Sequence, residues 1–299
     1  MPDASDNPSL MNARGLMAAR GLRPKKRYGQ NFLIDGRVLD KIITAAGADR
    51  DTLAIEIGPG LGALTQALAR VAGRVAAVEI DAGLAELLED NLRGCGNVDI
   101  IRADALEFDF EALIRAYKSD GLIRKVIAAA NLPYYAATPI TMRLIQKRGL
   151  IASVTVMLQK EVAGRFAAAP NTKDYGALSV MARYFARPAV VANVPRNCFF
   201  PRPDVDSAVV RFELFARPPV HVGDERAFFA FVKAAFATRR KTLANCLAVA
   251  RIPGLGVIGR GEAEEHLARL GHDPRARGET LSMEEFAALY GGLEARGQR

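Results

Sequence analysis

The sequence predicts an α/β fold built on a mostly parallel sheet, followed by a small α-helical C-terminal domain. Two observations predict the sheet: short apolar strand patterns alternate with helical patterns from residue 53 onward, and a glycine-rich turn follows the first strand. A third predicts the second domain, because only helical periodicity remains beyond Ala216-Arg217-Pro218-Pro219. We therefore expect a disordered extension at 1–24, a main domain at 25–217 and a helical domain at 218–299.

The elements of the main domain follow one another in a βαβα order. A helix at 38–46, closed by Gly47, precedes the first strand. The expected strands are short and largely apolar, and they lie at 53–57, 74–79, 98–102, 125–130 and 153–158. The expected helices have apolar residues at helical spacing, and they lie at 64–71, 82–92, 110–117, 139–146 and 160–168. Two further strands, at 190–194 and 208–212, are expected to close the sheet as an antiparallel pair, which makes seven strands.

Composition narrows the partners and the compartment. The 299 residues carry a formal net charge of +8, which favours polyanionic partners, nucleic acid before an anionic membrane. The cysteines lie too far apart to suggest a zinc site or a disulfide framework; they are Cys95, Cys198 and Cys246. The sequence shows no apolar run of ~18 residues and no secretory leader pattern. We therefore expect a cytoplasmic protein that binds neither a membrane nor a metal.

The glycine-rich turn after the first strand is a candidate cofactor site. Its sequence is Glu56-Ile57-Gly58-Pro59-Gly60-Leu61-Gly62-Ala63. Gly58 and Gly60 allow a sharp turn and let backbone amides approach a ligand at the edge of the sheet. Glu79 ends the second strand, where a carboxylate can accept hydrogen bonds from both hydroxyls of a ribose. Since the turn also satisfies GxGxxG/A, nicotinamide dinucleotides and S-adenosylmethionine both fit these features, and a dehydrogenase stays open as an alternative.

Two further positions favour S-adenosylmethionine. Asp104 follows the third strand, where its side chain can accept a hydrogen bond from the adenine amine of the cofactor, although a helix N-cap is the alternative. The fourth strand ends in Asn131-Leu132-Pro133-Tyr134. This tetrapeptide matches the (Asn/Asp)-x-Pro-(Tyr/Phe) pattern of enzymes that methylate exocyclic amines of bases. The sequence therefore predicts an amine methyltransferase ahead of a dehydrogenase.

The chemistry explains why such a turn is needed. The lone pair of an adenine amine is delocalised into the ring, so the planar nitrogen is a poor nucleophile. Acceptors from the Asn131 side chain and the Leu132 carbonyl, in a turn stiffened by Pro133, would hold the two N–H bonds and direct the lone pair toward the methyl group. Tyr134 would stack on the ring. Because a sulfonium is already a strong electrophile, positioning carries most of the catalysis, which agrees with the lack of a catalytic histidine or carboxylate pair.

Aromatic and basic residues predict contacts with a nucleic-acid substrate. A stacked base must be flipped out to reach the pocket. Phe199 or Phe200, on a proline-stiffened turn, is a candidate for the second face of the adenine, and core packing is the alternative. Two basic runs, Lys25-Lys26-Arg27 and Arg239-Arg240-Lys241, are candidates for phosphate contacts, and solvated surface is their alternative.

Together these motifs resemble the small-subunit ribosomal RNA adenine dimethyltransferase family, whose loss gives kasugamycin resistance. The resemblance extends from about Lys25 to Leu247. Its ordered motifs are Gly29-Gln30-Asn31-Phe32-Leu33, the glycine turn, Asn131-Leu132-Pro133-Tyr134, Leu158-Gln159-Lys160-Glu161, Tyr175-Gly176 with Leu178-Ser179-Val180, the Phe199 segment and Arg239-Arg240-Lys241-Thr242-Leu243. One departure is Tyr135-Ala136-Ala137-Thr138, where many members have Asn-Ile-Ser-Thr.

The resemblance implies a Rossmann-like class I S-adenosylmethionine methyltransferase domain and a helical RNA-binding domain. The implied cofactor contacts are Asn31, Leu33, Gly58, Glu79, Asp104 and Asn131. The implied stacking residues are Tyr134 and Phe199, the latter because it lies six residues before Val205, as the family phenylalanine does. The implied substrate is a pair of neighbouring adenosines in a hairpin loop near the 3′ end of 16S rRNA, each dimethylated late in assembly of the 30S subunit. We expect the protein to be a monomer with a role in ribosome biogenesis.

Besides the dehydrogenase, which would bind a nicotinamide dinucleotide, two alternatives remain open. One is the related resistance methylase that modifies a single adenosine of large-subunit RNA, which the helical tail with Arg239-Arg240-Lys241 and the Phe199 segment disfavour. The other is a ribosome-assembly or transcription-factor module with a vestigial cofactor pocket, which the intact Asn131 to Tyr134 turn disfavours. Cofactor binding and methylation assays separate these possibilities from the small-subunit methyltransferase.

Overall fold

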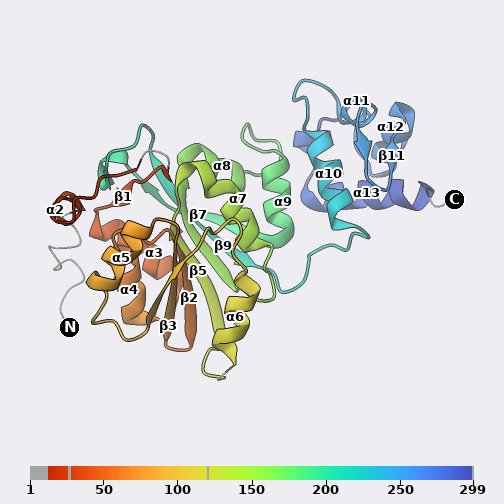
Figure 1. The fold of residues 1–299 in the computed structure, drawn as a ribbon. Coiled ribbons are helices and arrows are strands. Elements are labelled where there is room, and N and C mark those ends of the chain that lie inside the picture. The colour runs from red at the N-terminus through yellow and green to blue at the C-terminus, as the bar shows by residue number, and fades with distance from the viewer. Residues whose placement is uncertain (1–12, 26–27, 120, 298–299) are drawn as a thin grey trace. The chain divides into compact units, whose positions relative to one another are not determined.

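Figure 1 shows the computed structural model of the chain, which describes residues 13–25, 28–119 and 121–297. The chain divides into two compact units. The first consists of Met1–Ala163 and Arg187–Ala216, and the second of Gly164–Ala186 and Arg217–Arg299. Among the described residues, no helix is both long enough and apolar enough to cross a membrane.

A seven-stranded sheet forms the centre of the first unit, with the strand order β4-β3-β2-β5-β6-β9-β7. Its strands are β2 Thr52–Ile57, β3 Arg74–Glu79, β4 Val98–Arg102, β5 Lys125–Asn131, β6 Ser153–Gln159, β7 Ala186–Val194 and β9 Ser207–Leu214. The strands from β4 to β6 pair in parallel, and β9 pairs antiparallel with β6. The mostly parallel seven-stranded sheet is therefore confirmed, and its last two strands are neighbours as expected.

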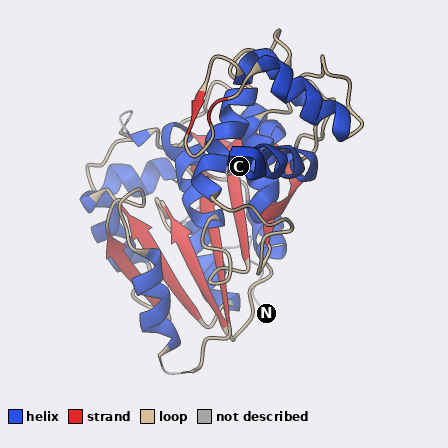
Figure 2. Ribbon diagram, turned by 90° about the vertical axis from the view of Figure 1, so that its right-hand side faces the viewer, coloured by secondary structure: helices blue, strands red, loops and turns tan. Residues whose placement is uncertain are grey.

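Helices flank this sheet. They are α3 Gly36–Ala46, α4 Ala63–Val71, α5 Ala82–Asn91, α6 Phe110–Lys118 and α7 Tyr134–Ile145. The helix α8 Lys160–Ala167 follows β6 and is divided between the two units. Figure 1 shows α4 and α5 on one side of the strands and α6 on the other, and Figure 2 shows the strands lying side by side between helices. Local sequence sets the helix ends, because Asp35, Asp81 and Asp109 cap α3, α5 and α6 by accepting backbone N–H bonds.

The strand order reverses next to β2, and this reversal places the site. The chain runs from β2 to β3 and β4 on one side and then crosses to β5 on the other side of β2. In the register of the sheet, Glu56 of β2 lies between Ala77 of β3 and Ala129 of β5. The carboxyl ends of these strands therefore meet at a topological switch point, where open α/β sheets bind ligands.

The second unit is mainly helical, with an aromatic core. Its helices are α9 Ala177–Phe185, α10 Glu225–Ala235, α11 Leu243–Leu247, α12 Arg260–Arg269 and α13 Met283–Gly297. The ring centroids of Tyr184 and Phe228 lie 5.7 Å apart, as do those of Phe231 and Tyr290. Tyr184 belongs to α9, so a segment expected within the 25–217 domain packs with the C-terminal helices. Contacts within the core decide that this segment belongs to the second unit. A domain boundary predicted from composition takes no account of such contacts.

Three expectations about local structure were wrong. Residues 13–24, expected to be disordered, include α2 Ala13–Ala19, whose Ala13 and Met17 lie one turn apart and are buried in an apolar cluster. Residues 1–12 lie outside the described residues. The helix expected at 139–146 already begins at Tyr134, because Pro133 takes the N-cap position. In the C-terminal region a two-residue hairpin, β10 Arg251–Ile252 with β11 Gly256–Val257, interrupts the helices, and pairing this short has no readable periodicity.

Candidate active site

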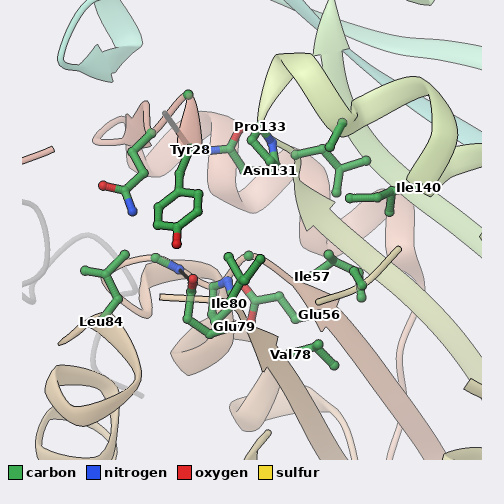
Figure 3. A pocket seen from close by; sticks show the side chains of 18 of the residues that line it. Tyr28, Glu56, Ile57, Val78, Glu79, Ile80, Leu84, Asn131, Pro133 and Ile140 are labelled. Carbon is green, nitrogen blue, oxygen red and sulfur yellow. Dashed lines mark hydrogen bonds between the residues drawn. The ribbon is translucent and has the colours of Figure 1, made fainter. Parts of the chain in front are cut away.

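One pocket collects most of the predicted site residues at the carboxyl ends of β2, β3 and β5 (Figure 3). It is also lined by residues 28–33 of the segment ahead of α3. The predicted residues that line it are Asn31, Leu33, Gly58, Gly60, Glu79, Asp104, Asn131, Leu132, Pro133 and Tyr134. The fold thus brings together positions that lie far apart in the sequence, and their individual roles stay predictions.

The glycine turn approaches the pocket in a conformation that suits glycine. Gly58 and Gly60 have φ angles of 66° and 58°, in the left-handed region that other residues rarely adopt. A Cβ atom on Gly60 would lie 2.9 Å from the Phe32 ring. Side chains are therefore excluded here, and the backbone itself forms the pocket wall.

Glu79 lies at the end of β3 and is 4% exposed. One carboxylate oxygen accepts from the Gly60 amide at 3.3 Å and the other from the Asp81 amide at 2.8 Å. Burial raises the pKa of this carboxyl above its usual range, and the two backbone hydrogen bonds act against that rise. Because each carboxylate oxygen can accept more than one hydrogen bond, Glu79 keeps acceptor capacity for hydroxyl donors in the pocket.

Glu56 is a pocket residue whose role the sequence analysis missed. It lines the pocket from β2 and is 1% exposed (Figure 3). Burial raises the pKa of its carboxyl to about 8, the Thr65 hydroxyl opposes the rise, and the negative charge of Glu79 adds to it. No donor among the described residues reaches its Oε2 atom. The signal that could have found it is a carboxylate within an otherwise apolar strand, a placement that is rare without a function.

Asp104 lines the pocket and also makes a local hydrogen bond to the backbone, but it does not cap a helix. Its Oδ1 atom accepts from the Leu106 amide at 2.8 Å, a local contact that caps a turn rather than a helix, since α6 has its own cap at Asp109. The residue also lines the pocket beyond β4. The local bond uses one carboxylate oxygen, so Asp104 retains a second acceptor for a ligand.

The Asn131 to Tyr134 turn joins β5 to α7 with its polar groups fixed. The Asn131 amide nitrogen donates to the carbonyl oxygen of Asn31 at 2.9 Å. Pro133 has a φ of −64° at the N-cap of α7. The hydroxyls of Tyr134 and Ser207 lie 2.7 Å apart in a hydrogen bond, which holds the tyrosine ring at the pocket wall. This turn is therefore rigid and presents both a polar group and an aromatic face.

The segment before Asn31 is held to the start of α5. The Lys25 ammonium donates to Asp81 at 2.8 Å, and the Gln30 amide donates to the same carboxylate at 3.1 Å. Burial alone would raise the pKa of Asp81, but the hydrogen bonds from Lys25 and Gln30 outweigh it and lower that pKa. Lys25, a predicted phosphate contact, instead forms an internal ion pair.

The structure does not bring Phe199 to the pocket. Its strand, β8 Phe199–Phe200, pairs antiparallel with β1 Phe32–Leu33, and Phe199 lies opposite Leu33. Its ring is 3% exposed and packs in the apolar core with Leu33 and Val209. In this conformation the core-packing alternative applies to Phe199, because strand pairing turns it toward the core. Stacking on an adenine is not supported for it.

The remaining predicted RNA contacts fall into three groups. Lys26 and Arg27 lie outside the described residues. The Arg239 guanidinium donates to the Lys173 carbonyl and lies 3.7 Å from the Glu279 carboxylate, so it is engaged within the second unit. Arg240 and Lys241 are exposed. Of the basic run at 239–241, the last two residues are therefore the better candidates for phosphate contacts.

Comparison with known proteins identifies close relatives. Residues 21–252 match the family described as ribosomal RNA adenine dimethylase. Curated relatives named "Ribosomal RNA small subunit methyltransferase A" include one from Pelotomaculum thermopropionicum, 50% identical over 95% of this chain and 97% of the relative. Another, from Geobacillus thermodenitrificans, is 49% identical over 93% of this chain and 94% of the relative.

Two solved structures share the fold. A dimethyladenosine transferase from Plasmodium falciparum superposes with a TM-score of 0.74 at 24% identity, over 89% of this chain and 98% of that structure. The 23S rRNA methyltransferase ErmE superposes with a TM-score of 0.66 at 26% identity, over 88% of this chain and 99% of that structure. These similarities confirm the predicted Rossmann-like methyltransferase fold.

Proposed function

The chain belongs to the ribosomal RNA adenine dimethylase family, and from this premise we propose that it methylates two adjacent adenosines in the 3′-terminal hairpin loop of 16S rRNA. As a member, it is an rRNA adenine dimethyltransferase that uses S-adenosylmethionine. The proposal concerns which adenosines are methylated and which residues bind the cofactor and the target base. Each adenosine would receive two methyl groups on its N6 amine, in the 30S subunit or its precursor.

The observation that carries the residue assignment is the orientation of the Asn131 amide. A carbonyl oxygen can only accept, so the amide nitrogen must face Asn31 and the Oδ1 atom faces away from it. With the Leu132 carbonyl in the same turn, this gives two acceptors for the two N–H bonds of an adenine amine. Held in that way, the nitrogen lone pair leaves conjugation with the ring and becomes nucleophilic. Tyr134, anchored through Ser207, would support the base by stacking.

The pocket fits S-adenosylmethionine in its donor and acceptor groups. Glu79 would accept from the ribose hydroxyls and Asp104 from the adenine amine, while the turn at Gly58 and Gly60 allows close backbone approach. When bound, the cofactor supplies a methyl group activated by a sulfonium, with a neutral thioether as leaving group. The chain's own residues then orient the amine and exclude water, and no strong base is required.

The curated relatives support the small-subunit target. Those at 50% and 49% identity are named for the small subunit. The 23S enzyme of similar fold is only 26% identical, which favours the small-subunit target. Because the two enzymes share the fold, a direct test still has to exclude a large-subunit target. Action on ribosomal particles would place the protein in the cytoplasm with a role in ribosome biogenesis. We expect it to act as a monomer, which sedimentation velocity of the full chain would test.

Methyl transfer to undermodified particles tests the function. The full chain with labelled cofactor is incubated with 30S subunits that lack the modification and, separately, with 23S rRNA. Mass spectrometry should find two neighbouring dimethyladenosines near the 3′ end of 16S rRNA. Label confined to 23S rRNA would reassign the target. If calorimetry detected no S-adenosylmethionine binding even with RNA present, a vestigial assembly module would become the better description.

RNA contact by the second unit has its own test. Replacing Arg240 and Lys241 with glutamine should weaken RNA binding and reduce the slope of log affinity against log salt by about 1 to 2, since each phosphate contact contributes about 0.7 to 0.9. The matched control is Arg260→Gln with Arg269→Gln on α12, which removes the same charge from residues paired with Glu264 and Glu265. Equal slopes in both double variants would argue against a specific contact.

A further inference from the structure

The pocket has a one-sided charge. Three carboxyl groups line it, from Glu56, Glu79 and Asp104. No lysine, arginine or histidine occurs among the described residues of its wall. Such a site favours a ligand that brings positive charge or hydrogen-bond donors.

The three carboxyl groups differ in how they are satisfied. Both oxygens of Glu79 accept backbone amides, and Oδ1 of Asp104 accepts from the Leu106 amide. The side chain of Glu56 is buried, with 1% exposed, yet its Oε2 atom has no hydrogen-bond partner among the described residues. A buried acceptor without a partner is costly, and in a binding site it marks the place of a missing donor or cation.

The position of Glu56 indicates which part of the cofactor it faces. In the sheet it lies on β2, between β3, which carries Glu79, and β5, which carries Asn131. If Glu79 holds the ribose and Asn131 holds the target amine, the sulfonium and amino acid part of the cofactor must lie between them. That part carries both positive charges of S-adenosylmethionine.

We propose that Glu56 is the counter-charge for a cationic group of S-adenosylmethionine and that it releases a proton when the cofactor binds. This inference rests on the proposed function, because it takes that cofactor as the ligand. It makes Glu56 a binding residue whose protonation state reports whether the site is filled.

The direction of the effect follows from the free site. With a pKa of about 8, roughly nine-tenths of Glu56 is protonated at pH 7. A cation beside the carboxylate favours the ionised form, so binding displaces the proton and affinity rises with pH up to about 8. The other titratable groups in the pocket are Glu79, Asp104, Tyr28, Tyr134 and Tyr135. The pKa values of Tyr134 and Tyr135 are raised, which leaves both phenols neutral in this range.

Calorimetry of the cofactor-free full chain tests the proposal. S-adenosylmethionine is titrated at pH 7 in two buffers of different ionisation enthalpy, which gives the number of protons released. We expect close to 0.9 per site for the unaltered protein and a dissociation constant that falls on the order of 50-fold from pH 6 to pH 8. Both effects should be lost in Glu56→Gln and kept in the control Glu86→Gln, an exposed residue of α5. Any release left in Glu56→Gln measures the share of Glu79, whose pKa is also raised.

S-adenosylhomocysteine locates the charge, because it keeps the ammonium group but has a neutral sulfur. Proton release with both ligands assigns the ammonium to Glu56, and release with S-adenosylmethionine alone assigns the sulfonium. Binding of S-adenosylmethionine without proton release, or with the same release in Glu56→Gln, would overturn the proposal. A complete lack of binding would instead contradict the proposed function. Since glutamine has nearly the shape of the protonated acid, we expect the variant to fold, and a circular dichroism melt checks this.

Discussion

Burial of Glu56 should leave a pH-dependent mark on the stability of the cofactor-free protein. The perturbation is Glu56→Gln, which keeps the shape of the protonated side chain and removes its titration. Burial raises the pKa of the Glu56 carboxyl from 4.5 to about 8 in the folded chain. Below pH 4.5 both the folded and the unfolded chain are protonated, so burial carries no ionisation cost. Between pH 4.5 and 8 the unfolded chain ionises while the folded chain keeps its proton, so the unaltered protein loses stability as pH rises.

The magnitude follows from the two pKa values. Each unit by which a pKa differs between the folded and unfolded chain corresponds to about 1.4 kcal/mol. At pH 5 the cost is below about 1 kcal/mol, and at pH 8 it is slightly above ~4 kcal/mol. Relative to the unaltered protein, Glu56→Gln should therefore gain about 3.5 kcal/mol between pH 5 and pH 8. The comparison cancels all groups that titrate alike in the two proteins.

The assay is urea unfolding followed by circular dichroism, since the chain contains no tryptophan for fluorescence. Unfolding curves at pH 5, 6, 7 and 8 give the stability gap between Glu56→Gln and the unaltered protein. Glu86→Gln should show a gap that stays constant with pH, because the side chain is exposed. A constant gap for Glu56→Gln would refute the reasoning, since it would mean that the buried carboxyl titrates as it does in the unfolded chain.

Three further predictions concern the rest of the pocket. Asn131→Ala should lower kcat on the order of 100-fold and change the cofactor dissociation constant far less. Single-turnover kinetics and calorimetry measure the two quantities, and a loss confined to cofactor binding would contradict the role assigned to Asn131. Gly60→Ala should cost about 1–3 kcal/mol of stability in urea unfolding, more than Gly149→Ala, which has a φ of 82° but open space for a Cβ. Tyr134→Phe keeps the aromatic ring, so it should retain most turnover and lose about 1 kcal/mol of stability with the hydrogen bond to Ser207. Tyr134→Ala should lose turnover, and similar turnover in both variants would exclude stacking.

Much of the site could be predicted because its motifs are short stretches of sequence and because the strands and helices show regular hydrophobic patterns. The strands were recognisable from apolar runs, and in a parallel sheet their carboxyl ends share one edge. Gly58, Glu79, Asp104 and Asn131 lie at the carboxyl ends of successive strands or just beyond them, so placing the strands was enough to bring these four residues together. No knowledge of side-chain packing was needed for that step.

Packing and partner choice were decided only by the tertiary structure. Phe199 had the motif position of a stacking residue, but pairing with Leu33 turns it into the core. Lys25 had the charge of a phosphate contact, but Asp81 holds it. These outcomes depend on residues distant in the sequence, which no local pattern encodes.

Glu56 shows the same division most clearly. The sequence by itself determined that a carboxylate lies near the end of the first strand of the parallel sheet, beside the glycine turn. Only the tertiary structure decided that this carboxylate is fully buried, lacks a partner for one oxygen and faces a pocket without a basic residue among its described walls. The physical reason is that the cost of ionising a group is set by the solvent and charges around it, and these are fixed when distant segments pack together.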